Sequence, residues 1–152
     1  MLIRVDDLRG PEIATLLQVH LDHMRGLSPP ESTHALDLDG LRTPDVTFWT
    51  AWRDDLLVGC GALKELDAHH GEIKSMHTAL AARGQGVAAA ILKTIMDEAE
   101  QRAYRRLSLE TGSMDGFRAA HRLYERFGFS ACAPFGDYVE DPNSIFMTFE
   151  IG

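Results

Sequence analysis

The stretch that decides the fold is Arg83-Gly84-Gln85-Gly86-Val87-Ala88, which follows the run Ile73-Lys74-Ser75-Met76-His77-Thr78 and precedes an amphipathic segment. This order predicts a strand, a glycine-rich turn and a helix. Two glycines let the chain turn tightly and leave backbone N–H groups uncovered by a Cβ atom. The unpaired N–H groups and the positive dipole end of the helix would face an anion, so the turn indicates a phosphate site.

The turn alone does not identify the phosphate ligand. The chain has no GxxxxGK[ST] motif, which excludes a P-loop. The spacing Gly84-x-Gly86-x-Ala88 follows a strand of an antiparallel meander, which is the wrong context for a dinucleotide fingerprint. A tight turn without any ligand is the alternative interpretation of the same tripeptide.

Hydrophobic periodicity, capping residues and turn residues predict the elements around the turn. The predicted helices span 11–25, ending at Gly26, then 34–42, 86–102 and 117–127, the last closed by Gly128. The predicted strands span 1–5, 46–52, 56–66, 72–78, 106–111, 129–133 and 144–151, with a loop over 112–116.

These elements predict one α+β domain over residues 1–152, with helices on both faces of a mixed, mostly antiparallel sheet. Three hairpin-linked strands form an antiparallel meander. The crossover through residues 86–102 should place the two strands that it joins parallel to each other. We therefore expect an α/β/α layered architecture.

Composition excludes several classes of partner. The 152 residues carry 15 basic and 23 acidic side chains, and this net charge of −8 argues against a broad nucleic-acid face. No stretch reaches the length of a membrane span, and the first residues lack a secretory apolar region, so we expect a cytoplasmic protein without membrane partners. Cys60 and Cys132 predict free thiols, and the histidines lack metal-ligand spacing, so we expect no metal.

Four features together resemble the GCN5-related N-acetyltransferase (GNAT) superfamily, within a bacterial subgroup, over nearly the whole chain. The segment Arg83–Ala88 fits the pattern [Arg/Gln]-x-x-Gly-x-[Gly/Ala] of the acetyl-CoA pyrophosphate loop of that family. The segment Glu72–Thr78 resembles its central strand, which splays from a neighbour, and Leu123-Tyr124-Glu125-Arg126-Phe127-Gly128-Phe129 resembles its "LYexxGF" segment. The order of predicted elements is the fourth feature.

The resemblance implies a sheet of six or seven strands with about four helices and a splayed central strand pair. It implies that acetyl-CoA is the cosubstrate and that a primary amine of a small molecule or peptide accepts the acetyl group directly. A homodimer is possible by analogy. The residues that it assigns to the cofactor are Met76, His77, Thr78, Arg83, Gly84, Gln85, Gly86, Val87, Ala88 and Phe117.

Acetyl transfer to an amine needs a base to remove the ammonium proton and an acid for the departing thiolate. The resemblance makes Tyr124 the candidate acid. Glu72, at the start of the splayed strand, and Glu110, near the end of the next strand, are the candidate bases. The alternatives left open are a Tyr124 that only packs, a solvated Glu72 and a Glu110 held in a structural salt bridge.

The acceptor side is less defined by the sequence. We expect His34, Trp49 and Asp137 to contact the acceptor, although the charged loop around Asp137 could simply be solvated. The loop before the last helix lacks the asparagine that many family members carry there, so Ser113 or Asp115 could take over its contact with the cofactor. A CoA-binding regulatory module without catalysis is the alternative function.

Overall fold

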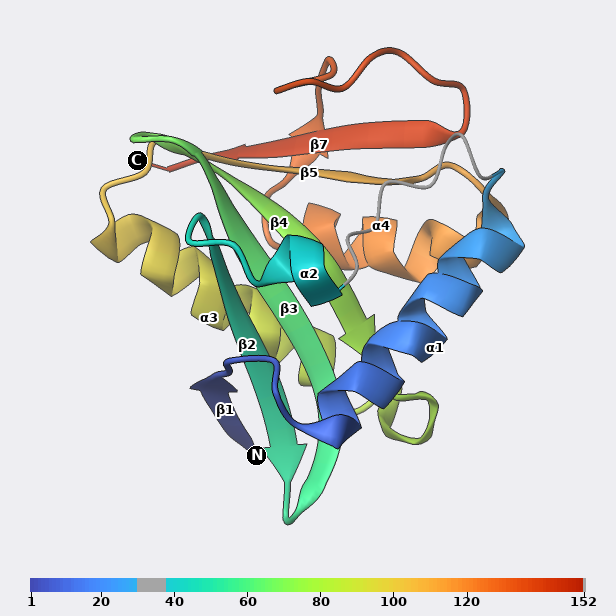
Figure 1. Ribbon diagram of the computed structural model, residues 1–152. Helices are drawn as coiled ribbons and strands as arrows, with labels where there is room; N and C mark the ends of the chain where they lie inside the picture. Colours follow the sequence, from blue (N-terminus) through green and yellow to red (C-terminus); the bar gives the residue numbers. More distant parts are fainter. Residues whose placement is uncertain (30–37, 152) are drawn as a thin grey trace.

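The computed structural model describes residues 1–29 and 38–151, and within them one seven-stranded sheet forms the middle layer (Figure 1). The strands are β1 (Leu2–Val5), β2 (Val46–Arg53), β3 (Leu56–Asp67), β4 (His70–Thr78), β5 (Arg106–Gly112), β6 (Ser130–Ala131) and β7 (Ser144–Glu150). The α-helices are α1 (Pro11–Leu27), α2 (Leu38–Leu41), α3 (Val87–Gln101) and α4 (Arg118–Arg126), with 3-10 turns η2 (Leu80–Ala82) and η3 (Asp115–Phe117).

The sheet order is β1-β2-β3-β4-β5-β7-β6, and every neighbouring pair is antiparallel except β4 and β5. The parallel pair is joined through α3, which confirms the predicted crossover. Figure 1 shows α1 and α2 on one face of the sheet and α3 and α4 on the other. The predicted mixed, mostly antiparallel architecture with helices on both faces is therefore confirmed.

The strands β4 and β5 pair along only part of their length. Their ladder runs from His70 and Arg106 to Ile73 and Leu109, and no further pair joins the two strands in the described residues. A register shift against β3 marks a bulge in β4, where Ser75 has φ +56° and its carbonyl accepts a bond from the Cys60 Sγ at 3.3 Å. Beyond the ladder the two strands separate, as the resemblance implies.

Helix α3 lies close against β3, which sets the position of its first turn beside this gap. Gly61 permits the approach, because a Cβ atom there would lie 2.7 Å from Cγ2 of Ile91. Ile91 and Ile95 are fully buried in the core cluster that this face of the sheet shares with α4. The apolar face of α3 therefore holds its N-terminus at a fixed place relative to β4.

Several boundaries differ from the predicted ones for local reasons. Helix α1 passes through Gly26 and ends at Leu27, where the N–H of Ser28 bonds the Met24 carbonyl at 2.9 Å. Strand β4 begins at His70 because it pairs with Asp67 across a two-residue turn. Gly128 closes α4 with φ +98°, as expected. Only residues 38–41 of the predicted helix over 34–42 are described as helix; residues 34–37 lie outside the described residues.

In the described residues, the helices are all too short or too polar to cross a membrane. Both cysteines are free, with Cys60 buried and Cys132 partly exposed, which agrees with the prediction of free thiols.

Candidate functional site

A cavity of about 410 Å³ occupies the gap between β4 and β5. Its walls come from β4, β5, α1, α4, the glycine turn with the start of α3, and the loop before β7. The three candidate catalytic residues Glu72, Glu110 and Tyr124 all line it. Nine of the expected cofactor residues also line it, namely Met76, His77, Thr78, Arg83, Gly84, Gly86, Val87, Ala88 and Phe117. The structure therefore brings most of the predicted site together.

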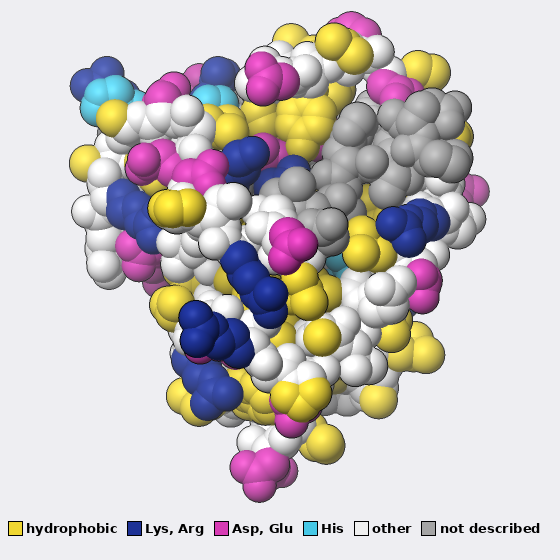
Figure 2. All heavy atoms as spheres, viewed as in Figure 1, with side chains coloured by type: hydrophobic (Ala, Val, Ile, Leu, Met, Phe, Trp, Pro, Cys, Tyr) yellow, Lys and Arg dark blue, Asp and Glu magenta, His cyan; other side chains and the backbone are white. Residues whose placement is uncertain are grey.

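The face of the molecule seen in Figure 2 carries exposed hydrophobic side chains, with acidic and basic side chains among them. Charges of both signs are therefore present on this face.

One end of the cavity is formed by backbone. Gly84 and Gly86 have φ +76° and +81°, a conformation that glycine adopts at no steric cost, and Gly86 caps α3. The first turn of α3 then leaves N–H groups without helical partners, and Val87 and Ala88 line the cavity. Gln85 does not line it; its side chain accepts a bond from Arg53 and donates to the Ala81 carbonyl at 3.4 Å. These contacts hold the turn from outside and leave its N–H groups available to an anion.

The middle of the cavity is bounded by the unpaired part of β4 and by α4. The Ser75 Oγ is buried and has no partner among the described residues. On α4, Tyr124 is buried and its ring meets Phe129 edge to face at 5.7 Å between centroids. Burial raises the pKa of the Tyr124 phenol above its ordinary value, so the group stays protonated at neutral pH. Tyr124 therefore presents a protonated hydroxyl to the cavity.

The far end holds a closed network of three polar groups. The Lys74 Nζ lies 3.1 Å from Glu72 Oε2 and donates to the Tyr138 Oη at 3.0 Å. The Tyr138 hydroxyl in turn donates to Glu72 Oε2 at 2.6 Å. The side chains of Lys74 and Glu72 are only 9% and 5% exposed, so this is a buried ion pair. Burial, and then the Glu72 charge, raise the pKa of Tyr138, which keeps it a donor.

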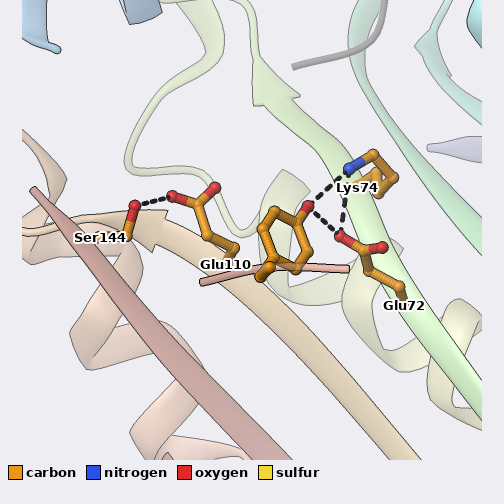
Figure 3. A network of polar contacts seen from close by, with 5 residues as sticks. Glu72, Lys74, Glu110 and Ser144 are labelled. Carbon is orange, nitrogen blue, oxygen red and sulfur yellow. Dashed lines mark hydrogen bonds and ion pairs between the residues drawn. The ribbon is translucent and has the colours of Figure 1, made fainter. Parts of the chain in front are cut away.

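The second carboxylate faces the same gap from the opposite strand. Figure 3 shows Glu110 on β5 with the Ser144 hydroxyl bonded to it, and Glu72 with Lys74 on β4. The Ser144 Oγ donates to Glu110 Oε2 at 2.7 Å. The two candidate bases thus lie on the two strands that separate, and both border the cavity.

Helix α1 contributes a buried histidine pair. The Nδ1 atoms of His20 and His77 lie 3.1 Å apart, and His77 Nε2 is buried without a partner among the described residues. Burial, followed by the nearby His23, lowers the pKa of His20 from 6.5 to about 4. Burial, followed by His20, Arg83 and His23, lowers that of His77 to about 3. Both imidazoles are therefore neutral at pH 7, and one Nδ1–H is shared between them.

Acidification should destabilise the domain through this pair. The unfolded histidines bind protons near pH 6.5 and the folded ones do not, so the free energy of unfolding falls as the pH drops from about 6.5 toward 4. His20 alone should account for a loss of about 3 kcal/mol over this range, and the contribution is fully present above pH 6.5. Urea unfolding at pH 7, 6 and 5 measures it.

Matched variants distinguish the contribution of this histidine pair to the pH dependence of stability from the contribution of the acidic side chains. A His20→Gln/His77→Gln protein should show a flatter pH dependence than the unmodified chain. The control His69→Gln removes an exposed imidazole and should keep the original slope. An unchanged slope in the double variant would contradict the assignment.

Two residues that the sequence predicted to contact the acceptor do not line the cavity. Trp49 is 4% exposed and packs in the core with residues of α3, because its position on β2 faces that helix. Asp137 is exposed and does not line the cavity, whereas its neighbour Tyr138 does. The structure thus places Trp49 in the core and not at an acceptor cleft, whereas a contact between Asp137 and the acceptor stays a prediction. His34 lies outside the described residues.

In the loop that lacks the family asparagine, the two side chains proposed to take over its contact, Ser113 and Asp115, bond to other groups of the protein. The Ser113 Oγ donates to the Pro142 carbonyl at 2.8 Å, and Asp115 forms an exposed ion pair with Arg118 at 3.1 Å. Neither residue lines the cavity. Phe117 does, and it packs on Gly112, where a Cβ atom would lie 2.1 Å from Cε2 of the ring.

The sequence reasoning missed three contributors: Lys74, Tyr138 and His20. Lys74 had a usable signal, because residues two apart on a strand share a face and Glu72 is two positions away. Tyr138 had none, since it approaches Glu72 from a loop 66 residues further along the chain. His20 comes from a helix 57 residues before His77.

Comparison with known proteins gives consistent matches. The model of the acetyltransferase (GNAT) family matches residues 13–129. The uncharacterized N-acetyltransferase YsnE of Bacillus subtilis (strain 168) is 58% identical over 97% of this chain and 98% of its own length. The uncharacterized N-acetyltransferase YedL of Escherichia coli (strain K12) is 49% identical over 98% and 94%.

A solved structure shares the fold. The crystal structure of a GNAT family acetyltransferase from Elizabethkingia anophelis, which has acetyl-CoA bound, superposes with a TM-score of 0.74. It is 20% identical and covers 99% of this chain and 97% of that one.

Proposed function

Because the chain belongs to the acetyltransferase (GNAT) family and is an N-acetyltransferase, we propose that it transfers an acetyl group directly from acetyl-CoA to a primary amine, with Tyr124 as acid and Glu72 as base. The observation that carries this proposal is that one cavity, in the gap between β4 and β5, holds all the groups that the reaction needs. This cavity joins the N–H groups of the glycine turn, the protonated Tyr124 and the Glu72 carboxylate. The acceptor is a small molecule or a peptide.

The cosubstrate fits this cavity by its chemistry. The glycine turn and the first turn of α3 supply N–H donors for the pyrophosphate, and the exposed Arg83 adds a positive charge beside them. The edge of β4 beyond Ile73 is not paired with β5, so its backbone groups can bond the amides of the pantetheine arm. These contacts would place the thioester between Tyr124 and Glu72.

The reaction then needs two protons to leave the nitrogen and one to reach the sulfur. Glu72 takes a proton from the bound ammonium, and the amine attacks the thioester carbonyl carbon. The bond between carbon and sulfur breaks as the amide forms, and Tyr124 gives its proton to the leaving thiolate. The attacking nitrogen then loses its second proton to the Tyr124 phenolate, and the proton held by Glu72 passes to solvent. Glu110 is the second candidate for the base, since it borders the same cavity from β5.

A panel of acceptors tests the activity. Tyramine, histamine, spermidine, free amino acids and peptides with free amino termini are each incubated with acetyl-CoA, and release of the CoA thiol is recorded against a reaction without acceptor. We expect at least one amine to raise the rate well above that background. Calorimetric titration should also show tighter binding of CoA than of ADP, because the pantetheine arm adds contacts.

The outcomes separate the alternatives. Binding of CoA without turnover on any amine would favour a regulatory module that binds the cofactor only. Equal binding of CoA and ADP would reduce the glycine turn to a general phosphate site.

A further inference from the structure

We infer that Tyr138 is a positioning residue that holds the Glu72 carboxylate in its reactive orientation, with Lys74 completing the arrangement. The inference rests on the proposed role of Glu72 as the base. It assigns a role to the loop between β6 and β7, from which Tyr138 reaches across the gap to β4.

The two donors converge on one oxygen of the carboxylate. Tyr138 Oη lies 2.6 Å and Lys74 Nζ 3.1 Å from Glu72 Oε2, and Nζ also lies 3.0 Å from Oη. Each of the three groups therefore bonds the other two. A short bond from a neutral hydroxyl to a carboxylate is strong and directional. The closed triangle fixes the rotation of the carboxylate as well as its position.

The other oxygen of the Glu72 carboxylate, Oε1, is left to accept a proton from the acceptor. Oε1 of Glu72 accepts no hydrogen bond from residues 1–29 or 38–151, and it is not among the buried atoms that lack a partner. Glu72 borders the cavity, so Oε1 can meet an ammonium there. A base that is held on one oxygen and open on the other is oriented before the acceptor arrives, which reduces the entropy lost in reaching the reactive geometry.

The ring of Tyr138 is held independently of its hydroxyl. Its centroid lies 5.1 Å from that of Phe135 and 5.5 Å from that of Phe146, in an aromatic cluster above the gap. Such contacts persist when only the oxygen is removed. Tyr138→Phe is therefore a selective test, because it deletes the bonds of the hydroxyl to Lys74 and Glu72 and keeps the packing.

The chain also offers a matched control. Tyr104 is another buried tyrosine whose hydroxyl donates to a carboxylate, Glu65, at 2.7 Å. Tyr104 and Glu65 do not line the cavity. Tyr104→Phe removes the same atom from the same kind of pair away from the site, so it reports any effect of lost stability alone.

The experiment compares steady-state kinetics of these variants with acetyl-CoA and the fastest amine of the panel. Tyr138→Phe should lower kcat about 10-fold and leave KM for acetyl-CoA unchanged, while Tyr104→Phe keeps the kcat of the unmodified enzyme. If Tyr138 acts only through Glu72, a Glu72→Gln/Tyr138→Phe protein should be no slower than Glu72→Gln alone.

The possible failures can be told apart. A normal kcat in Tyr138→Phe, with kcat lost in Glu72→Gln, would overturn the positioning role and leave the proposed base intact. Multiplied losses in the double variant would likewise overturn it, because Tyr138 would then act separately from Glu72. A normal kcat in Glu72→Gln would instead remove the proposed base, and this inference with it.

Discussion

Replacing Tyr124 by phenylalanine should lower kcat about 100-fold while KM for acetyl-CoA and the dissociation constant of CoA stay the same. The reason is that the variant loses the proton for the departing thiolate and nothing else. Burial raises the pKa of this phenol, so the hydroxyl is protonated over the whole neutral range. The phenyl ring keeps its edge-to-face contact with Phe129. Steady-state kinetics and calorimetry measure the two effects separately.

One further measurement completes the test of Tyr124. The thermal unfolding midpoint of the variant should match that of the unmodified enzyme, which excludes loss of fold as the cause of slow turnover. A kcat equal to that of the unmodified enzyme would mean that Tyr124 packs in the core and takes no part in proton transfer.

Replacing Glu72 by glutamine should lower kcat by about 10²-fold or more at neutral pH, because the acceptor ammonium then has no carboxylate to take its proton. The amide still accepts a hydrogen bond from Tyr138, so the shape of the site is kept. The Lys74 ammonium loses its buried counter-charge, and we expect a loss of about 1–3 kcal/mol in the free energy of unfolding. Turnover at increasing pH provides a second readout, because an acceptor that is already neutral needs no base.

Glu110→Gln is the matched variant for this prediction. It removes the carboxylate on the opposite strand and keeps an oxygen that can accept the bond from Ser144. We expect a smaller loss of kcat than in Glu72→Gln. A larger loss in Glu110→Gln, or no recovery of Glu72→Gln at high pH, would transfer the role of base to Glu110 or to another group.

The glycine turn and the helix after it could be predicted from sequence because their determinants are local. Gly84 and Gly86 adopt positive φ in a turn that is defined by its immediate neighbours, and the helix that follows is set by its own apolar spacing. The closure of α4 by Gly128 is local for the same reason. The family resemblance added the separation of β4 and β5, which spacing alone does not indicate.

The contacts around Glu72 and His77 could not be predicted because their partners are distant in sequence. Glu72 meets Tyr138 over 66 positions, and His20 meets His77 over 57. A hydrophobic pattern reports which face of an element is buried and does not report its partner, so it did not reveal that Trp49 packs in the core. The bulge at Ser75 likewise depends on β3, through the register shift beside Cys60.

The short ladder between β4 and β5 is where the strands β1 to β4 join the strands β5, β7 and β6 in one sheet. Only four residue pairs form it, from His70 with Arg106 to Ile73 with Leu109, and the strands diverge from there. Packing at the closed end is tight, because a Cβ atom on Gly71 would lie 2.8 Å from both Leu63 and Tyr104. The closed end around Gly71 is therefore built from residues that do not line the cavity, and the open end is left to residues that do.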